Sequence, residues 1–212
     1  MVCVIIPEPE HGTSNPNVTT KMIDAQDATY LYELLTRHDI PVWLTGGWGI
    51  DALLGEETRP HKDLDVILLR QDITRLFVLL EEHGYHMHEL WSENRWVQDP
   101  QGNRIPTAFV LADLGGRQLD VHAMDLDPHG NGIPAWTEAD DFIFTARELA
   151  GQGTIAGTAV NCITPECQVK CHSGYPLPES QRQDLAHLQE QFGVEIPSVD
   201  ASGKPGSETP PE

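Results

Sequence analysis

Two aspartates separated by one residue, on a segment that otherwise resembles a buried strand, constrain this chain more than any other feature of its sequence. Asp63 and Asp65 alternate with Leu64 and Val66. Side chains two positions apart on a strand point to the same face, so both carboxylates project together while the apolar side chains face the core. Two like charges this close repel each other, and a divalent cation would supply the counter-charge. Oxygen-only ligands favour Mg²⁺ or Mn²⁺ over zinc.

A glycine pair precedes the two aspartates at the end of another apolar segment. Residues 41–45 are predicted as a short strand, and Gly46 and Gly47 as a tight turn into a helix at about residues 49–54. Backbone N–H groups at a helix N-terminus can hold phosphate. A lone Gly-Gly or a lone Asp-x-Asp says little. The order strand, glycine pair, helix, loop and Asp-x-Asp strand is far more specific.

The rest of the chain predicts an α+β fold around a mixed sheet. The expected order is helix, strand, helix, strand, helix, then a meander of strands, with helices at the end. Apolar residues at helical spacing predict two further helices in the first half. The expected helices are residues 24–38, 72–83, 165–172 and 178–192. The expected strands are residues 64–69, 85–90, 95–99, 105–112, 117–124 and 160–163.

The length of 212 residues fits one domain of average size with a small appendix. Residues 1–20 are interpreted as a flexible arm, and residues 197–212, with four prolines, as a disordered tail. Between them we expect a main domain at residues 21–150. A small helical C-terminal part at residues 151–196 would belong to the same unit.

The charge balance excludes one large class of function. The chain has 33 acidic and 13 basic side chains and a formal net charge of -20. Such a surface repels nucleic-acid phosphates and anionic lipid, and it suits a cationic or neutral small molecule. Solubility alone, or a salt-tolerant host, would explain the charge as well. No apolar segment approaches the ~20 residues of a membrane span, and no signal peptide is recognised. Four sparse cysteines fit reduced thiols, so we expect a cytoplasmic protein.

The segment from Leu44 to Leu68 resembles the nucleotidyltransferase superfamily, whose fingerprint is a glycine turn followed by an Asp-apolar-[Asp/Glu]-apolar strand. The longer gap here, with GGWGIDALLG and TRPHKDLD, resembles the antibiotic nucleotidyltransferases of the aminoglycoside-2″ and lincosamide types. QLDVHAMDLDPHGNG and CITPECQVKCHSGYPLPESQRQDLAHL, from residues 118 and 162 onward, are more similar to the lincosamide type. The resemblance covers about residues 25–191.

This resemblance implies a polymerase-beta-like fold and a defined reaction. Such enzymes transfer a nucleoside monophosphate, usually AMP from ATP, to a drug hydroxyl and release pyrophosphate with the help of Mg²⁺. The expected partners are a nucleoside triphosphate and a small hydroxylated acceptor, a lincosamide first and an aminoglycoside second. A same-fold enzyme of unrelated metabolism and an inactive binding module are the alternatives. The nucleotide base and the oligomeric state, a homodimer included, stay open.

The superfamily needs a third carboxylate on a neighbouring strand and places it in an L-D-[I/V]-H segment. In residues 117–124, Asp120 and His122 alternate with apolar side chains and therefore share one face. The resemblance assigns Asp120 as a metal ligand beside Asp63 and Asp65, as the general base, or as both. Asp113 and Asp125 are the alternatives, ranked lower because they lie near strand ends.

The resemblance also places three basic-type side chains near the triphosphate. Arg59, His61 and Lys62 lie in the loop before the aspartate pair, where they would offset the charge of the leaving pyrophosphate. The expected nucleotide site also includes the glycine turn and the residue after it: Gly46, Gly47 and Trp48. Packing in the core is the stronger interpretation of Trp48.

Three further side chains are candidates for contact with the acceptor. His122 would either orient Asp120 or touch the substrate. His172 and Tyr175 lie in the HSGY segment that resembles the lincosamide type and would border the pocket. Cys167 and Cys171, four apart on a predicted helix, lack a second ligand pair at zinc spacing and are interpreted as buried thiols.

Overall fold

The computed structural model describes residues 21–136, 142–173 and 176–196. Its centre is a mixed eight-stranded sheet in the order β3-β6-β7-β2-β1-β10-β9, with β8 paired to β7, and β4 and β5 form a separate two-stranded sheet. The strands are β1 (Val42–Leu44), β2 (Asp63–Leu69), β3 (Tyr85–Leu90), β4 (Trp96–Gln98), β5 (Arg104–Pro106), β6 (Ala108–Asp113), β7 (Gln118–Leu126), β8 (Gly132–Pro134), β9 (Gly151–Ile155) and β10 (Thr158–Cys162). The α+β architecture predicted from the sequence is confirmed.

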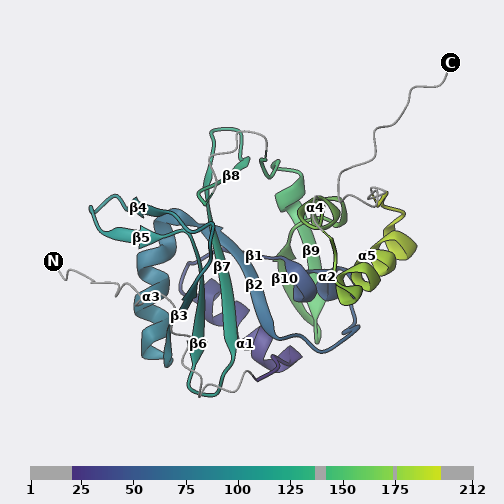
Figure 1. Cartoon of the computed structure of the whole chain (residues 1–212), viewed down its shortest axis with the longest axis horizontal. Helices are drawn as coiled ribbons and strands as arrows, with labels where there is room; N and C mark the ends of the chain where they lie inside the picture. The colour runs from purple at the N-terminus through teal and green to yellow at the C-terminus, as the bar shows by residue number, and fades with distance from the viewer. Residues whose placement is uncertain (1–20, 137–141, 174–175, 197–212) are drawn as a thin grey trace.

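Five α-helices flank the sheet within the described ranges. They are α1 (Ala25–Arg37), α2 (Gly46–Leu54), α3 (Ile73–Glu82), α4 (Pro165–Cys171) and α5 (Glu179–Phe192), with short 3-10 turns at Arg70–Asp72 and Glu148–Ala150. Helix α3 lies beside β3 at one end of the sheet, and α4 and α5 lie beside α2 at the other (Figure 1). No helix in these ranges is both long and apolar enough to cross a membrane.

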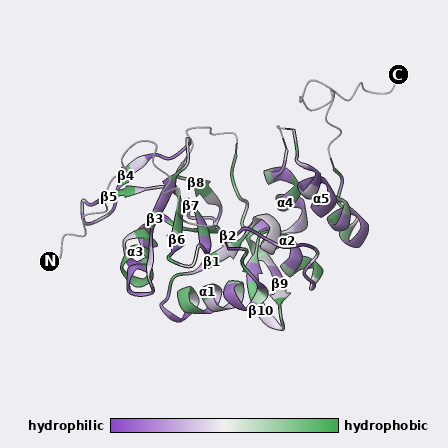
Figure 2. Cartoon of the chain, turned by 60° about the horizontal axis from the view of Figure 1, so that its bottom comes forward, coloured by the Kyte–Doolittle hydropathy of each residue, from purple (hydrophilic) through white to green (hydrophobic). Residues whose placement is uncertain are grey.

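The main core lies on one face of the sheet. The apolar side chains of β2 and β7 alternate with polar ones, so that Leu64, Val66, Leu119 and Val121 are buried with residues of α1 and α3. In Figure 2 both helices carry apolar and polar bands, as expected of helices with one buried side. The polar side chains of the two strands are therefore directed to the opposite face of the sheet.

Some element boundaries differ from the sequence-based expectation. Helix α2 begins at Gly46, within the glycine turn itself, instead of at about residue 49. The strand expected at residues 105–112 is divided into β5 and β6 at Thr107, whose N–H and hydroxyl bond the segment that enters β4. Residues 151–162, which we placed in the helical C-terminal part, form β9 and β10 of the main sheet. The C-terminal helical part therefore begins at α4.

Helix α2 is fixed between the sheet and the C-terminal helices. A small apolar cluster joins Ile50 of α2 to Val169 of α4 and to Leu185 and Leu188 of α5. On the sheet side, the backbone of α2 approaches β9 so closely that a Cβ at Gly153 would lie 2.2 Å from the carbonyl oxygen of Ala52. This contact requires glycine, because the neighbour is backbone and cannot rotate away.

Replacing Gly153 with alanine should therefore destabilise the fold. Overpacking of this kind costs about 1–3 kcal/mol, and each kcal/mol lowers the Tm of a chain of this size by about 2–4 °C. Gln152→Ala, on the exposed side of the same strand, is the matched control and should stay within about 0.5 kcal/mol of the wild type. Equal melting temperatures for the two variants would contradict close packing of α2 on β9.

Candidate active site

Parallel pairing of β2 with β7 brings the predicted carboxylates together. Asp65 is the register partner of Asp120, and Ile67 is the partner of His122. Partners in register point to the same face, so Asp63, Asp65 and Asp120 face one side of the sheet. All three line a cavity of about 520 Å³, a size typical of small-molecule sites.

The glycine turn lies directly against these carboxylates. Gly46 has a φ of 59°, in the left-handed region that favours glycine. A Cβ there would lie 2.2 Å from Asp65 Oδ2, and one at Gly47 would lie 2.1 Å from His61 Nδ1. The N-terminus of α2 therefore opens into the cavity beside the aspartates because both turn residues lack side chains.

The electrostatics of the aspartate group favour a bound cation. Burial, together with the neighbouring Asp63 and Asp120, raises the pKa of Asp65 well above its usual range. Burial and Asp120 also raise the pKa of Asp63, and Lys62 only partly offsets them. Mutual repulsion of buried carboxylates raises the pKa in this way, and a cation would reverse it.

The carboxylates fit a hard metal ion that takes only part of its coordination from the protein and the rest from water and phosphate oxygens. Within the described residues, no three His, Cys, Asp or Glu side chains converge into a group that could hold a metal alone. Mg²⁺ commonly takes only one or two carboxylates and completes its shell with water and substrate phosphate oxygens. Asp63 and Asp65, next to the N-terminus of α2, provide such a partial set.

Asp120 is held by side chains from a turn that sequence reasoning missed. The indole Nε1 of Trp91 donates to Asp120 Oδ1 at 2.9 Å, and His122 Nδ1 lies 3.4 Å from the same oxygen. His122 Nε2 in turn lies 3.4 Å from Glu93 Oε1. Trp91 and Glu93 come from one turn after β3, in which Asn94 N donates to Trp91 O at 2.9 Å. No sequence spacing indicated that this turn would meet β7.

His122 lies between these acidic groups and an aromatic wall. Burial disfavours its charged form, but hydrogen bonds and charge from Asp120 and Glu93 outweigh burial and raise the pKa of His122. Its ring meets Trp136 edge-on at a centroid distance of 4.9 Å. Trp136 and Phe144, together with Trp91, also line the cavity. We call these three side chains the aromatic half of the lining, and the glycine turn, the aspartates and the basic loop (Arg59, His61 and Lys62) the charged half.

Two buried carboxylates hold the basic loop in place. Asp184 of α5 accepts two hydrogen bonds from Arg59 Nε, at 3.0 and 3.2 Å, and one from Nη2 at 2.6 Å. Asp51 of α2 lies 2.5 Å from His61 Nε2 and accepts from the backbone and hydroxyl of Thr58. Sequence reasoning predicted neither contact, and Asp184 lies 125 positions from its partner.

Most of the predicted nucleotide-site residues line the cavity, and one does not. The lining includes Gly46, Gly47, Arg59, His61 and Lys62. Trp48 is a correction to the expected site: its side chain is 1% exposed in the main core, with its ring 4.8 Å from that of His61. It supports His61 from behind and does not face the cavity.

The C-terminal segment adds one predicted residue to the cavity wall. His172 lines the cavity, and its Nδ1 lies 2.7 Å from the carbonyl oxygen of Gln168, to which it must donate. In the neutral ring, Nε2 is then the acceptor. Tyr175 lies outside the described residues. Cys167 is buried, and Cys171 lines the cavity beside His172.

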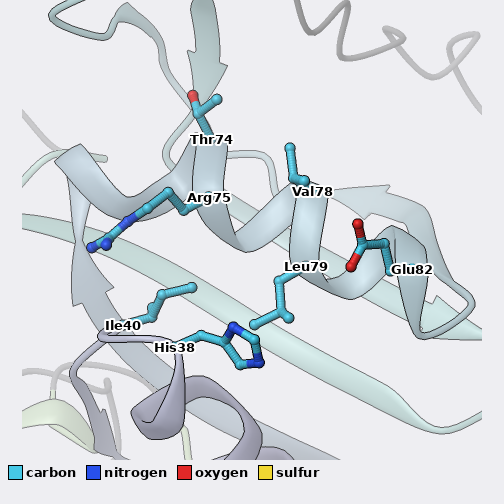
Figure 3. A pocket seen from close by; sticks show the side chains of 7 residues that line it. All are labelled: His38, Ile40, Thr74, Arg75, Val78, Leu79 and Glu82. Atoms are coloured by element: carbon cyan, nitrogen blue, oxygen red, sulfur yellow. The ribbon is translucent and has the colours of Figure 1, made fainter.

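The alternative third carboxylates are not part of this cavity. Asp113, at the far end of β6, pairs with Arg117 Nη2 at 2.5 Å. Asp125 accepts from Arg70 Nε at 2.9 Å. A second cavity of about 290 Å³ lies between the end of α1 and α3, and its wall contains Arg75 and Glu82 (Figure 3). That cavity lacks the aspartate group, so the 520 Å³ cavity is the candidate active site.

Comparison with known proteins agrees with this geometry. The family described as aminoglycoside-2″-adenylyltransferase matches residues 28–188. A lincosamide resistance protein of Staphylococcus haemolyticus is 27% identical over 82% of the chain and 97% of the relative. A 2″-aminoglycoside nucleotidyltransferase of Klebsiella pneumoniae is 28% identical over 66% of the chain and 69% of the relative.

Solved structures show the same fold. A lincosamide antibiotic adenylyltransferase with lincomycin bound superposes with a TM-score of 0.66 at 25% identity, covering 80% of this chain and 98% of the other. ANT(2″)-Ia in complex with adenylyl-2″-tobramycin superposes with a TM-score of 0.56 at 20% identity, covering 79% and 90%. The polymerase-beta-like architecture implied by the sequence resemblance is therefore confirmed.

The repulsion at Asp65 predicts a stability effect of known sign. Because the folded pKa of this carboxyl is raised, folding stability falls as pH rises above the unfolded value of about 3.9. Asp65→Asn removes this penalty and should raise the Tm at pH 7 in EDTA, by about 2–4 °C for each kcal/mol relieved.

The gain should shrink as the pH falls toward the unfolded pKa of about 3.9 and should vanish below it, where wild-type Asp65 is protonated in both states. Since the whole chain is strongly acidic, Glu190→Gln on the exposed side of α5 controls for the loss of one negative charge. A Tm for Asp65→Asn no higher than that of this control would show that the aspartate group is not repulsive.

Proposed function

The chain belongs to the aminoglycoside-2″-adenylyltransferase family, and from this premise we propose that it transfers AMP from ATP to a hydroxyl of a lincosamide-like antibiotic, releasing pyrophosphate. Like the relatives named above, it is a nucleotidyltransferase. The observation that carries the proposal is the meeting of the glycine turn, Asp63, Asp65 and Asp120 in one cavity.

The charged half of the cavity is the proposed nucleotide site. Backbone N–H groups at the N-terminus of α2 favour a phosphate, and Gly47 lets it approach. Arg59 and Lys62 offset the charge that develops on the leaving pyrophosphate. Asp63 and Asp65 would hold Mg²⁺ or Mn²⁺, which when bound neutralises phosphate charge and polarises the phosphorus.

Asp120 is the proposed general base, and it also contributes to metal binding as a secondary role. Both neighbours of this carboxylate, Trp91 Nε1 and His122 Nδ1, contact Oδ1. We therefore assign the acceptor proton to Oδ2. The indole fixes the plane of the carboxylate, so the base needs no reorientation when the hydroxyl arrives.

The aromatic half of the cavity is the proposed acceptor site. Trp91 and Trp136 flank Asp120 and His122, and the cavity also contains the carboxylate of Glu93. This combination suits an acceptor with hydroxyl groups, an amine and an apolar part. The near-complete coverage of the lincosamide-type relatives also favours that class. An aminoglycoside acceptor is the second candidate, supported by the family match.

The reaction is tested by incubating the protein with Mg²⁺, labelled ATP and a panel of lincosamides and aminoglycosides. Mass spectrometry should detect an adenylylated lincosamide, and the product should vanish for Asp63→Asn or Asp65→Asn. Glu190→Gln should retain full turnover. Turnover in either aspartate variant would contradict the metal assignment. No product from any acceptor would indicate a same-fold protein with another function.

The role of Asp120 is tested by Asp120→Asn. If the base role dominates, this change lowers kcat roughly 10²–10⁴-fold and leaves ATP·Mg²⁺ binding nearly intact. Asp125→Asn, a carboxylate of the same strand outside the cavity, should match the wild type. Weak ATP·Mg²⁺ binding by Asp120→Asn would show a metal ligand instead. Near-normal binding and turnover would exclude Asp120 from both roles.

A further inference from the structure

We propose that Asp184 is a positioning residue for the nucleotide site: helix α5 uses this carboxylate to direct the guanidinium of Arg59 toward the triphosphate. The inference rests on the proposed function, because it assumes that Arg59 contacts the nucleotide. It adds a role in positioning the nucleotide site to the packing of helix α5 against α2.

The contact between Asp184 and Arg59 fixes the orientation of the guanidinium as well as its distance from the carboxylate. The carboxylate accepts from Nε and Nη2 of Arg59, along one edge of the planar guanidinium. The third nitrogen, Nη1, donates to the carbonyl oxygen of Pro60 at 3.2 Å. Paired hydrogen bonds on a guanidinium restrict its rotation as well as its position.

The guanidinium that is held in this way lies against the phosphate side of the cavity. A Cβ added to Gly47 would lie 3.0 Å from Arg59 Nη2, the nitrogen that Asp184 holds most tightly. Arg59 lines the cavity together with Gly46 and Gly47. Asp184 thus places a positive charge beside the N-terminus of α2, where backbone N–H groups also favour an anion.

The position of Asp184 is set by the packing of α5. Leu185 and Leu188 of the same helix are buried against Ile50 of α2. Gln181, three residues before Asp184 and therefore on the same side of the helix, lines the cavity. Asp184 is 3% exposed, whereas Glu179 of the same helix is 68% exposed in its pair with Arg182. A buried, paired carboxylate has a defined partner and little freedom to move.

A structural role alone would not require this arrangement. Replacing a buried ion pair by apolar side chains is often neutral or stabilising, so such pairs are weak evidence for stability. The hydrogen bonds to Asp184 contribute most to the raised pKa of the Arg59 guanidinium, and the charge of Asp65 attracts this guanidinium as well. The hydrogen bonds to Asp184 therefore compete with an ion pair between Arg59 and Asp65, which would occupy a carboxylate needed for the cation.

The test compares steady-state kinetics of the full-length protein and its variants with ATP and a lincosamide acceptor. Arg59→Gln should raise the KM for ATP roughly tenfold or more, and Asp184→Asn should raise it by a similar factor, within the 10–100-fold range typical of supporting residues. The KM for the acceptor should stay unchanged in both. The double variant should be no worse than Arg59→Gln alone, because Asp184 acts through Arg59.

Glu179→Gln, which breaks the exposed ion pair of the same helix, is the matched control and should resemble the wild type. If Asp184→Asn does not fold, Asp184→Glu keeps the charge, displaces the guanidinium and should also raise the KM for ATP. An unchanged KM for ATP in Arg59→Gln would overturn the nucleotide role proposed for Arg59. A raised value in Arg59→Gln with a wild-type or lower value in folded Asp184 variants would overturn the positioning role alone.

Discussion

The parallel pairing of β2 with β7 is the constraint on which the rest of the site depends. Its register sets Asp65 opposite Asp120, so a shift by one residue would turn one carboxylate toward the apolar core and Leu64 or Leu119 toward the cavity face. The apolar residues on the core face therefore also determine where the charged residues meet. In this sense the packing of α1 and α3 on one face of the sheet maintains the active-site geometry on the other face.

Carboxylates perform two opposite tasks around this register. Burial and the charge of Asp120 raise the pKa values of Asp63 and Asp65, and Asp63 raises that of Asp65 further, which prepares a place for a cation. Asp51 and Asp184 instead hold basic side chains of the loop before β2. The protein keeps these two sets on different elements: carboxylates of the helices pair with Arg59 and His61, whereas Lys62 only partly offsets the charge of the aspartate group.

The sequence predicted the parts of this site that depend on local patterns. Alternation placed Asp120 and His122 on one face. The glycine pair predicted a tight turn, and Gly46 in that turn has a left-handed φ that favours glycine. The residues that sequence analysis missed are held by long-range contacts. Nothing in the segment around Trp91 indicates that its indole meets Asp120, and nothing near Asp184 indicates a partner 125 positions earlier. Trp48 was included in the expected nucleotide site although packing was the stronger interpretation, because a residue after a phosphate-type turn can face either the core or the ligand; the structure places it in the core.

The division of the cavity into two halves has a consequence for how such a protein can change over generations. The glycine turn, the basic loop and two of the aspartates come from one continuous stretch, residues 45–65, in which close contacts restrict substitution at Gly46 and Gly47. The aromatic half is contributed by separate segments that carry Trp91, Trp136 and Phe144. If the two halves hold nucleotide and acceptor as proposed, mutations at Trp136 or Phe144 would alter which acceptor is bound without changing the residues that hold the nucleotide. Selection by a new acceptor would then act on one half of the pocket alone.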